Sequence, residues 1–234
     1  TIGSTNGITK AGPATLTLSG VNTFTGPLTI STGLLAVEGA GQLGIGNFAT
    51  NIVNNAAFVY NSSADQILGG PISGTGSLTK TNVSALMLNG LVSNTVLVAG
   101  GYLGGTGMLI GTVTNFAAIG AATASTIGTL SVSNLVMKEN ASCLWNYNDT
   151  TNDVIQVTGS LTLPNVATVN VSQVTSGQLP KEGVLFSSGT PLLGASNLSG
   201  WVVRGDGVHA DTRMVIRGNR VIISSMGGTL ISFH

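Results

Sequence analysis

Short strand-like segments that each end in a turn recur along this chain, and they constrain its fold more than any other feature. Each has four residues of alternating or continuous β-prone character, followed by a small residue and a glycine. Branched side chains fill the half-buried surface of a strand, and glycine permits the positive φ of the turn. No helical period separates the segments, so the pattern indicates stacked coils. The clearest examples are TLTLSG (15–20), LTISTG (28–33), LLAVEG (34–39), ALMLNG (85–90), TVLVAG (95–100) and VIQVTG (154–159).

Charge is scarce, and this limits the classes of partner. Charged residues make up 7% of the chain, against about 25% in ordinary soluble domains. The eight basic residues balance the eight acidic ones, so no basic stripe is available for nucleic acid. A weakly charged surface also has little repulsion to oppose association. No apolar run is long enough for a transmembrane segment.

Two further features concern stability and processing. Cys143 is the only cysteine, so an internal disulfide is excluded. The chain begins at Thr1, without methionine or a signal segment, which is typical of a processed mature form or a fragment.

An internal duplication supports the coil reading. Residues 8–20 (ITKAGPATLTLSG) align with residues 78–90 (LTKTNVSALMLNG), and residues 28–39 align with residues 96–107 after a small deletion. The spacing of about 70 residues corresponds to roughly three solenoid coils of 20–25 residues each. We therefore expect an all-β protein with one elongated domain. Its coils span residues 1–172, and residues 173–234 form terminal coils or a β cap of the same domain.

The segments at 8–37 and 72–90 resemble the autotransporter-associated β-strand repeat. The resemblance implies a right-handed parallel β-helix that a bacterium exports to its surface or to the extracellular space. Neither the resemblance nor the residues indicate a cofactor or a metal. The matching positions are Thr9, Lys10, Gly12, Thr15, Leu16, Leu18, Ser19, Gly20, Asn22, Phe24, Gly26, Ile30, Gly33 and Leu35.

The tripeptide Arg204-Gly205-Asp206 is a candidate receptor site. Its opposite charges on an exposed turn would suit an integrin-like receptor. The alternative, which the frequency of chance tripeptides favours, is a tight turn between strands.

Carboxylates are too few and too scattered to favour catalysis. Glycoside hydrolysis needs two carboxyl groups about 5–10 Å apart. Asp149 and Asp153 are the only close pair outside the terminal region. That pair could bind Ca²⁺ through oxygen ligands, although a turn rich in Asn and Asp is the favoured interpretation. We therefore predict that the protein is not an enzyme, with a polysaccharide lyase or glycosidase as the least favoured alternative.

The favoured function is structural: an extracellular solenoid that assembles end to end with copies of itself. A solenoid without caps exposes unpaired backbone groups at both ends, and the C-terminal segment 220–234 is rich in β-branched residues with no charge after Arg220. An adhesin that binds a surface glycan or a host protein along one face is the alternative. The candidate assembly residues are Val221, Ile222, Ile223, Thr229, Leu230, Ile231 and Phe233.

Overall fold

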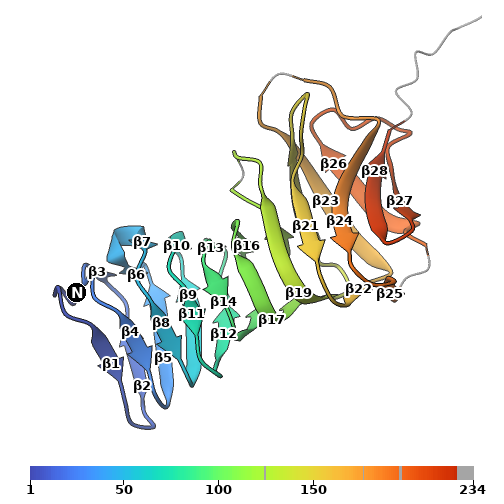
Figure 1. Ribbon diagram of the computed structural model, residues 1–234. Helices are drawn as coiled ribbons and strands as arrows, with labels where there is room; N and C mark the ends of the chain where they lie inside the picture. The colour runs from blue at the N-terminus through green and yellow to red at the C-terminus, as the bar shows by residue number, and fades with distance from the viewer. Residues whose placement is uncertain (124, 176, 195–196, 226–234) are drawn as a thin grey trace, which may run out of the picture.

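A computed structural model describes residues 1–123, 125–175, 177–194 and 197–225. It is a parallel β-solenoid of about 8 coils in one domain (Figure 1), which confirms the predicted fold class. Among the described residues there is no α-helix, and one short 3₁₀ turn, η1 (Gly44–Gly46), interrupts the strands.

Each coil contributes strands to three faces, which we number in chain order. Face 1 contains β1 (Ile8–Lys10), β4 (Leu28–Ile30), β8 (Ile52–Asn54), β11 (Ile72–Ser73), β14 (Leu91–Val92), the first halves of β17 (Met108–Asn115) and β19 (Thr129–Met137), β21 (Val154–Val157) and β24 (Glu182–Ser188). Face 2 contains β2 (Thr15–Leu18), β5 (Leu34–Gly39), β9 (Ala57–Ser62), β12 (Ser77–Lys80), β15 (Thr95–Val98), the second halves of β17 and β19, β22 (Leu161–Leu163) and β25 (Leu193–Gly194).

Face 3 begins with the short pair β3 (Val21–Asn22) and β6 (Gln42–Leu43). It continues with β7 (Asn47–Phe48), β10 (Gln66–Leu68), β13 (Ala85–Leu88), β16 (Tyr102–Gly104), β18 (Ala118–Gly120), β20 (Ser142–Tyr147), β23 (Val166–Gln173) and β26 (Gly200–Gly205). A hairpin of β27 (Arg213–Arg217) and β28 (Arg220–Ser224) follows the last coil.

The core is a set of apolar rows that run along the solenoid. On face 1, Leu28 pairs with Ile52, Ile52 with Ile72, and Ile72 with Val92, and all four side chains are buried. Alternate residues of each strand point inward, so a parallel register that repeats from coil to coil places like side chains above one another. The alternation in the sequence thereby becomes a continuous hydrophobic core.

Buried polar side chains lie at or beside the strand ends, where the chain turns a corner. A corner interrupts the backbone ladder, and its buried N–H and C=O groups need other partners. The Gln66 amide, for example, accepts a hydrogen bond from the Leu43 N–H at 2.8 Å and donates to the Leu43 carbonyl at 3.0 Å. The buried side chains that play this part are Lys10, Asn22, Asn54, Gln66, Lys80, Asn94 and Asn115.

The two copies of the duplicated motif build the same corner on different faces. Lys10 ends β1 on face 1, whereas Lys80 ends β12 on face 2. The chain passes through β4 and β8 to reach β11 on face 1 again, and β12 comes next. The repeat therefore spans roughly three coils and one further face, so its two copies lie at different corners. The reason is that the motif specifies a corner, and the corners after face 1 and after face 2 both adopt it.

Candidate functional sites

The C-terminal end of the solenoid is closed by the hairpin. β28 pairs in antiparallel fashion with β24 on one side and with β27 on the other, and β27 contacts β26 (Figure 1). Val221, Ile222 and Ile223 are buried, and β28 is paired on both sides, so these three residues do not form an open edge, and their part in self-assembly stays a prediction. Their β-branched pattern suits a strand that is paired on both sides as well as one at an edge. The remaining candidates, Thr229, Leu230, Ile231 and Phe233, lie outside the described residues.

The N-terminal coil presents a different end. β1, β2 and β3 each pair with one strand of the next coil, namely β4, β5 and β6. The Ile8 N–H donates to the Pro27 carbonyl and the Lys10 carbonyl accepts from the Ser31 N–H. Because backbone groups alternate in direction along a strand, the N–H and C=O of Thr9 point away from the solenoid. Within the part of the chain that the structure describes, β1 and β2 form an open parallel edge, whereas on face 3 the carbonyls of Ile2 and Ser4 accept hydrogen bonds from the N–H groups of Thr23 and Thr25.

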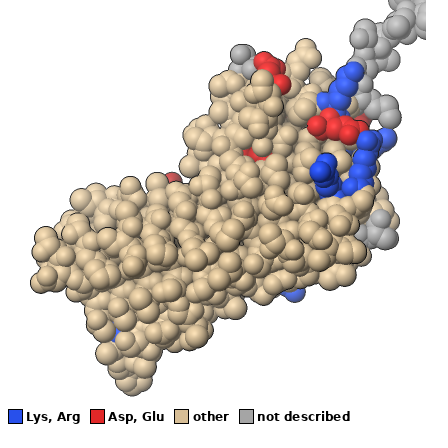
Figure 2. Space-filling model, in the orientation of Figure 1, with Lys and Arg blue, Asp and Glu red and all other residues tan. Residues whose placement is uncertain are grey.

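Charged side chains are also distributed unequally between the two ends of the solenoid. Half of the charged side chains lie between residues 181 and 220, and Figure 2 shows them gathered at the C-terminal end while the N-terminal coils are almost free of charge. Over the first 137 residues the sequence has Lys10, Glu38, Asp65 and Lys80, and both lysines are buried. The exposed surface of these coils is therefore close to neutral.

Each residue of the Arg204-Gly205-Asp206 tripeptide has a place in the fold. Arg204 and Gly205 belong to β26, and a β-carbon on Gly205 would lie 2.0 Å from the Val171 carbonyl oxygen. The Asp206 carboxylate accepts a hydrogen bond from the Gln173 N–H at 3.0 Å. The tripeptide therefore ends a strand with a turn, and the receptor role stays a prediction.

The Asp149 and Asp153 side chains serve different parts of the backbone. Asp149 accepts from the Gln178 N–H at 3.1 Å, while Asp153 accepts from the Gly128 N–H at 2.8 Å and the Asn146 N–H at 3.0 Å. No group of three or more His, Cys, Asp or Glu side chains that could hold a metal ion occurs among the described residues. Both carboxylates therefore cap backbone N–H groups.

Asp153 belongs to a buried polar cluster that fixes the segment between β18 and β19. The Asn146 amide donates to the carbonyls of Thr123 (2.7 Å) and Thr126 (2.8 Å), and the Tyr102 hydroxyl donates to the Ala122 carbonyl. Asp153 as a residue is 1% exposed, and burial raises the pKa of its carboxyl to about 6. This network holds the segment above face 3, where it forms a raised edge (Figure 1).

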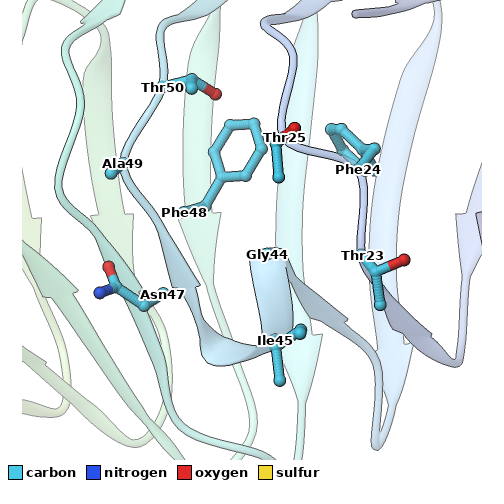
Figure 3. Close-up of a pocket in the computed structure, with 9 residues that line it drawn as sticks. All are labelled: Thr23, Phe24, Thr25, Gly44, Ile45, Asn47, Phe48, Ala49 and Thr50. Carbon is cyan, nitrogen blue, oxygen red and sulfur yellow. The ribbon is translucent and has the colours of Figure 1, made fainter. Parts of the chain in front are cut away.

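A small hollow lies on face 3 near the N-terminal end (Figure 3). It measures about 170 Å³ and is lined from two neighbouring coils. The rings of Phe24 and Phe48 pack edge to face with their centroids 5.2 Å apart, and Thr25 is a neighbour in the lining. Both rings are buried, so this hollow is mainly a packing feature of the first coils.

A larger hollow, the face 3 trough, runs along the outer side of β10, β13 and β16 and measures about 540 Å³. Its floor follows one row of the register, in which Asn47 pairs with Ile67, Ile67 with Met87, and Met87 with Gly104. η1 bounds the trough at one end and the segment with Thr123 and Ser125 bounds it at the other. Its lining also includes Gln42, Ile45, Gly46, Asp65, Gln66, Ala85 and Tyr102.

The sequence analysis did not single out the trough. Its residues come from five separated segments that only the coil register brings together. The nearest sequence signals are the long connection after residue 120, which lacks strand alternation, and the glycine pair at 44 and 46. Both interrupt the regular coil, and each marks one end of the trough.

Comparison with known families supports the solenoid assignment. Residues 8–37 match the passenger-associated-transport-repeat family, and they form β1 to β4 and the start of β5. Together with the fold, this match supports a β-helix repeat protein of the autotransporter passenger type. Such a repeat indicates a secreted or surface-displayed protein. No curated protein matches the chain. None of the described helices has the length and apolar character needed to cross a membrane.

Proposed function

We propose that this chain is a non-catalytic structural solenoid of an extracellular or surface-displayed passenger, with one end that accepts a further coil and one end that is closed. The asymmetry of the two ends carries the proposal. An open parallel edge at β1 can receive a strand by β-augmentation. The antiparallel hairpin at the other end covers the last coil.

Charged side chains also oppose strand pairing at the C-terminal end. β27 is the outer strand of the hairpin, and Arg213 and Arg217 are exposed on it. Charged side chains on an edge strand oppose pairing with another chain. A homopolymer that grows end to end needs a receptive edge at each end, and at the C-terminal end the outer strand of the hairpin, β27, carries exposed charge. We therefore expect a chain of residues 1–234 to form pairs that meet through their N-terminal edges, in place of the fibres that the sequence suggested.

The use of the carboxylates supports a non-catalytic role. Glu139 accepts hydrogen bonds from the N–H groups of Asn165 and Val166, both at 3.0 Å, and Asp65 accepts from the Ala85 N–H at 2.7 Å. Asp149, Asp153 and Asp206 also cap backbone N–H groups, as described above. Acids that complete the backbone of a coil are poorly placed to exchange protons with a substrate.

Analytical ultracentrifugation over a range of concentrations, with electron microscopy of the same samples, tests the proposal. We expect a monomer–dimer equilibrium and no fibres. Thr9→Pro removes an N–H that points to the open edge, so it should abolish the dimer, while Thr9→Ala should preserve it. Fibres, or a dimer that Thr9→Pro leaves unchanged, would refute assembly through this edge.

A further inference from the structure

We infer that the face 3 trough is a binding site for a neutral oligosaccharide. The inference is independent of the assembly proposed above, because the trough lies on a side of the solenoid and the open edge lies at its end. It rests on the shape of the trough, on the hydrogen-bonding groups that remain free in it, and on its charge.

The shape suits an extended ligand. The trough is lined by η1, by β10, β13 and β16, and by the segment held by Asn146 and Asp153. Figure 1 shows β10, β13 and β16 following one another along the solenoid. Neighbouring strands are about 4.8 Å apart, so the three strands of the floor span on the order of 10 Å along the solenoid axis. This length accommodates linked sugar rings that lie along the axis.

The floor of the trough has apolar and aromatic side chains that are held in fixed positions. Ile67 and Met87 are neighbours in the register. The Tyr102 ring lies against the backbone of the next coil, because a β-carbon on Gly120 would stand 2.4 Å from its hydroxyl oxygen. The hydroxyl also donates to the Ala122 carbonyl, so the ring is held at both ends. A fixed ring of this kind can pack against the apolar face of a pyranose at a small entropic cost.

The polar groups of the trough are mostly oriented by the protein itself. The Gln42 amide nitrogen donates to the Asp65 carbonyl at 2.9 Å, and one Asp65 carboxylate oxygen accepts from the Ala85 N–H at 2.7 Å. The second carboxylate oxygen of Asp65 and the amide oxygen of Gln42 remain available as acceptors. The exposed Asn47 amide has no hydrogen-bond partner among the described residues. Acceptors that are already positioned, together with one free amide, complement the hydroxyl groups of a sugar.

The charge of the trough lining determines which oligosaccharides it favours. No lysine or arginine lines the trough in the described part of the chain, and Asp65 is its one charged residue. An anionic polymer such as a polyuronate would meet a carboxylate with no cation to compensate it. A polymer with many ammonium groups would meet a single carboxylate, that of Asp65, and its other ammonium groups would have no opposite charge in the trough. The chemistry therefore favours a chain of uncharged hexoses.

Isothermal titration calorimetry with cellohexaose, laminarihexaose and mannohexaose tests the inference on the full chain. We expect at least one of them to bind with a dissociation constant in the millimolar range or below. The affinity should change little between low and high salt, because no ion pair contributes. Hexamers of galacturonate and of glucosamine serve as anionic and cationic comparators and should bind more weakly.

Two variants in the trough locate the site. Asn47→Ala and Tyr102→Ala should each weaken binding by at least about fivefold, as expected when a contact worth about 1 kcal/mol is lost. Thr17→Ala, an exposed position on face 2, is the matched control and should leave the affinity unchanged. Tyr102→Phe keeps the ring, so it should retain most of the affinity, and it separates loss of the ring from loss of the bond to Ala122.

The inference is overturned if none of the neutral hexasaccharides binds, if a charged hexamer binds more tightly, or if binding survives in both Asn47→Ala and Tyr102→Ala. Thermal unfolding of each variant accompanies the titrations. If Tyr102→Ala fails to fold, Asn47→Ala decides the outcome alone, because its exposed side chain has no structural partner among the described residues.

Discussion

The ammonium nitrogen of Lys10 lies 2.8 Å from the point where a β-carbon on Gly33 would stand. Lys10 donates to the carbonyls of Gly12 (2.7 Å) and Thr32 (3.0 Å), so its buried charge ties two successive coils together. The next coil can close over this group only if residue 33 has no side chain. Lys80 has the same relation to Gly101, at 2.7 Å. The lysine and the glycine therefore act as one unit at each corner.

Gly33→Ala should destabilise the protein more than Gly12→Ala. Both glycines have positive φ, 74° and 81°, so either substitution places alanine in the left-handed region, at a cost of roughly 1–2 kcal/mol. A β-carbon at Gly12 meets no atom within 4 Å, whereas one at Gly33 would lie 2.5 Å from the Gly12 carbonyl oxygen. Overpacking adds about 1–3 kcal/mol. Urea denaturation of the two variants measures the difference, and equal losses would mean that the corner tolerates the extra carbon.

Lys80→Met should lower the free energy of unfolding by about 1–3 kcal/mol for each buried group left without a partner. The Lys80 ammonium donates to the carbonyls of Thr81 and Asn82, and its side chain is fully buried. Lys181→Met, at an exposed position, is the control and should change the free energy by less than about 0.5 kcal/mol. Chemical denaturation at neutral pH compares them. Similar small losses for both lysines would show that the corner carbonyls find other partners.

The free energy of unfolding should decrease as the pH rises from about 4 to about 6, because of Asp153. Burial raises the pKa of its carboxyl from 3.8 in a model peptide to about 6 in the fold, so the folded state binds the proton more tightly than the unfolded state. The contribution of this group to stability is complete below about pH 4 and is lost as the pH rises through 6. The shift of about two units corresponds to a loss of at most about 3 kcal/mol.

Asp153→Asn isolates this contribution. Glu139 contributes a pH dependence of stability with the opposite sign, because hydrogen bonds from Asn165 and Val166 lower its pKa. Burial raises the pKa values of Tyr102 and Cys143 far above this range, so both stay neutral. The difference in unfolding free energy between the parent and Asp153→Asn should therefore vary with pH between 4 and 6 and be constant above 7. A difference that is independent of pH would show that Asp153 titrates normally.

Cys143 should be inert to thiol reagents in the folded protein. Its side chain is fully buried on face 3, and burial raises the pKa of the thiol, so neither access nor thiolate is available. A colorimetric disulfide reagent should label it only after unfolding in guanidinium. In a Cys143→Ala background, Thr95→Cys at an exposed position of β15 should react without denaturant. Rapid labelling of Cys143 in native buffer would indicate that face 3 opens readily.

The sequence alone determined the solenoid and its corners. Alternating apolar residues, Lys10 and Lys80 at the ends of strand segments, and glycines at the turns are local signals. They specify short-range geometry without knowledge of the partner strand. For this reason stacked β-coils could be predicted from one sequence, while the parallel β-helix was implied by the resemblance to the repeat family. The recurring motif was found before its face was known.

The tertiary structure decided the closed end, the face on which each motif copy lies, and the trough. β-branched residues such as Val221 and Ile223 suit parallel and antiparallel pairing equally, and strand order depends on contacts between residues distant in the chain. The trough likewise joins Asn47, Met87 and Thr123 only through the register of successive coils. A pattern of side chains describes how one segment behaves, whereas a surface site and a capped end depend on which segments meet.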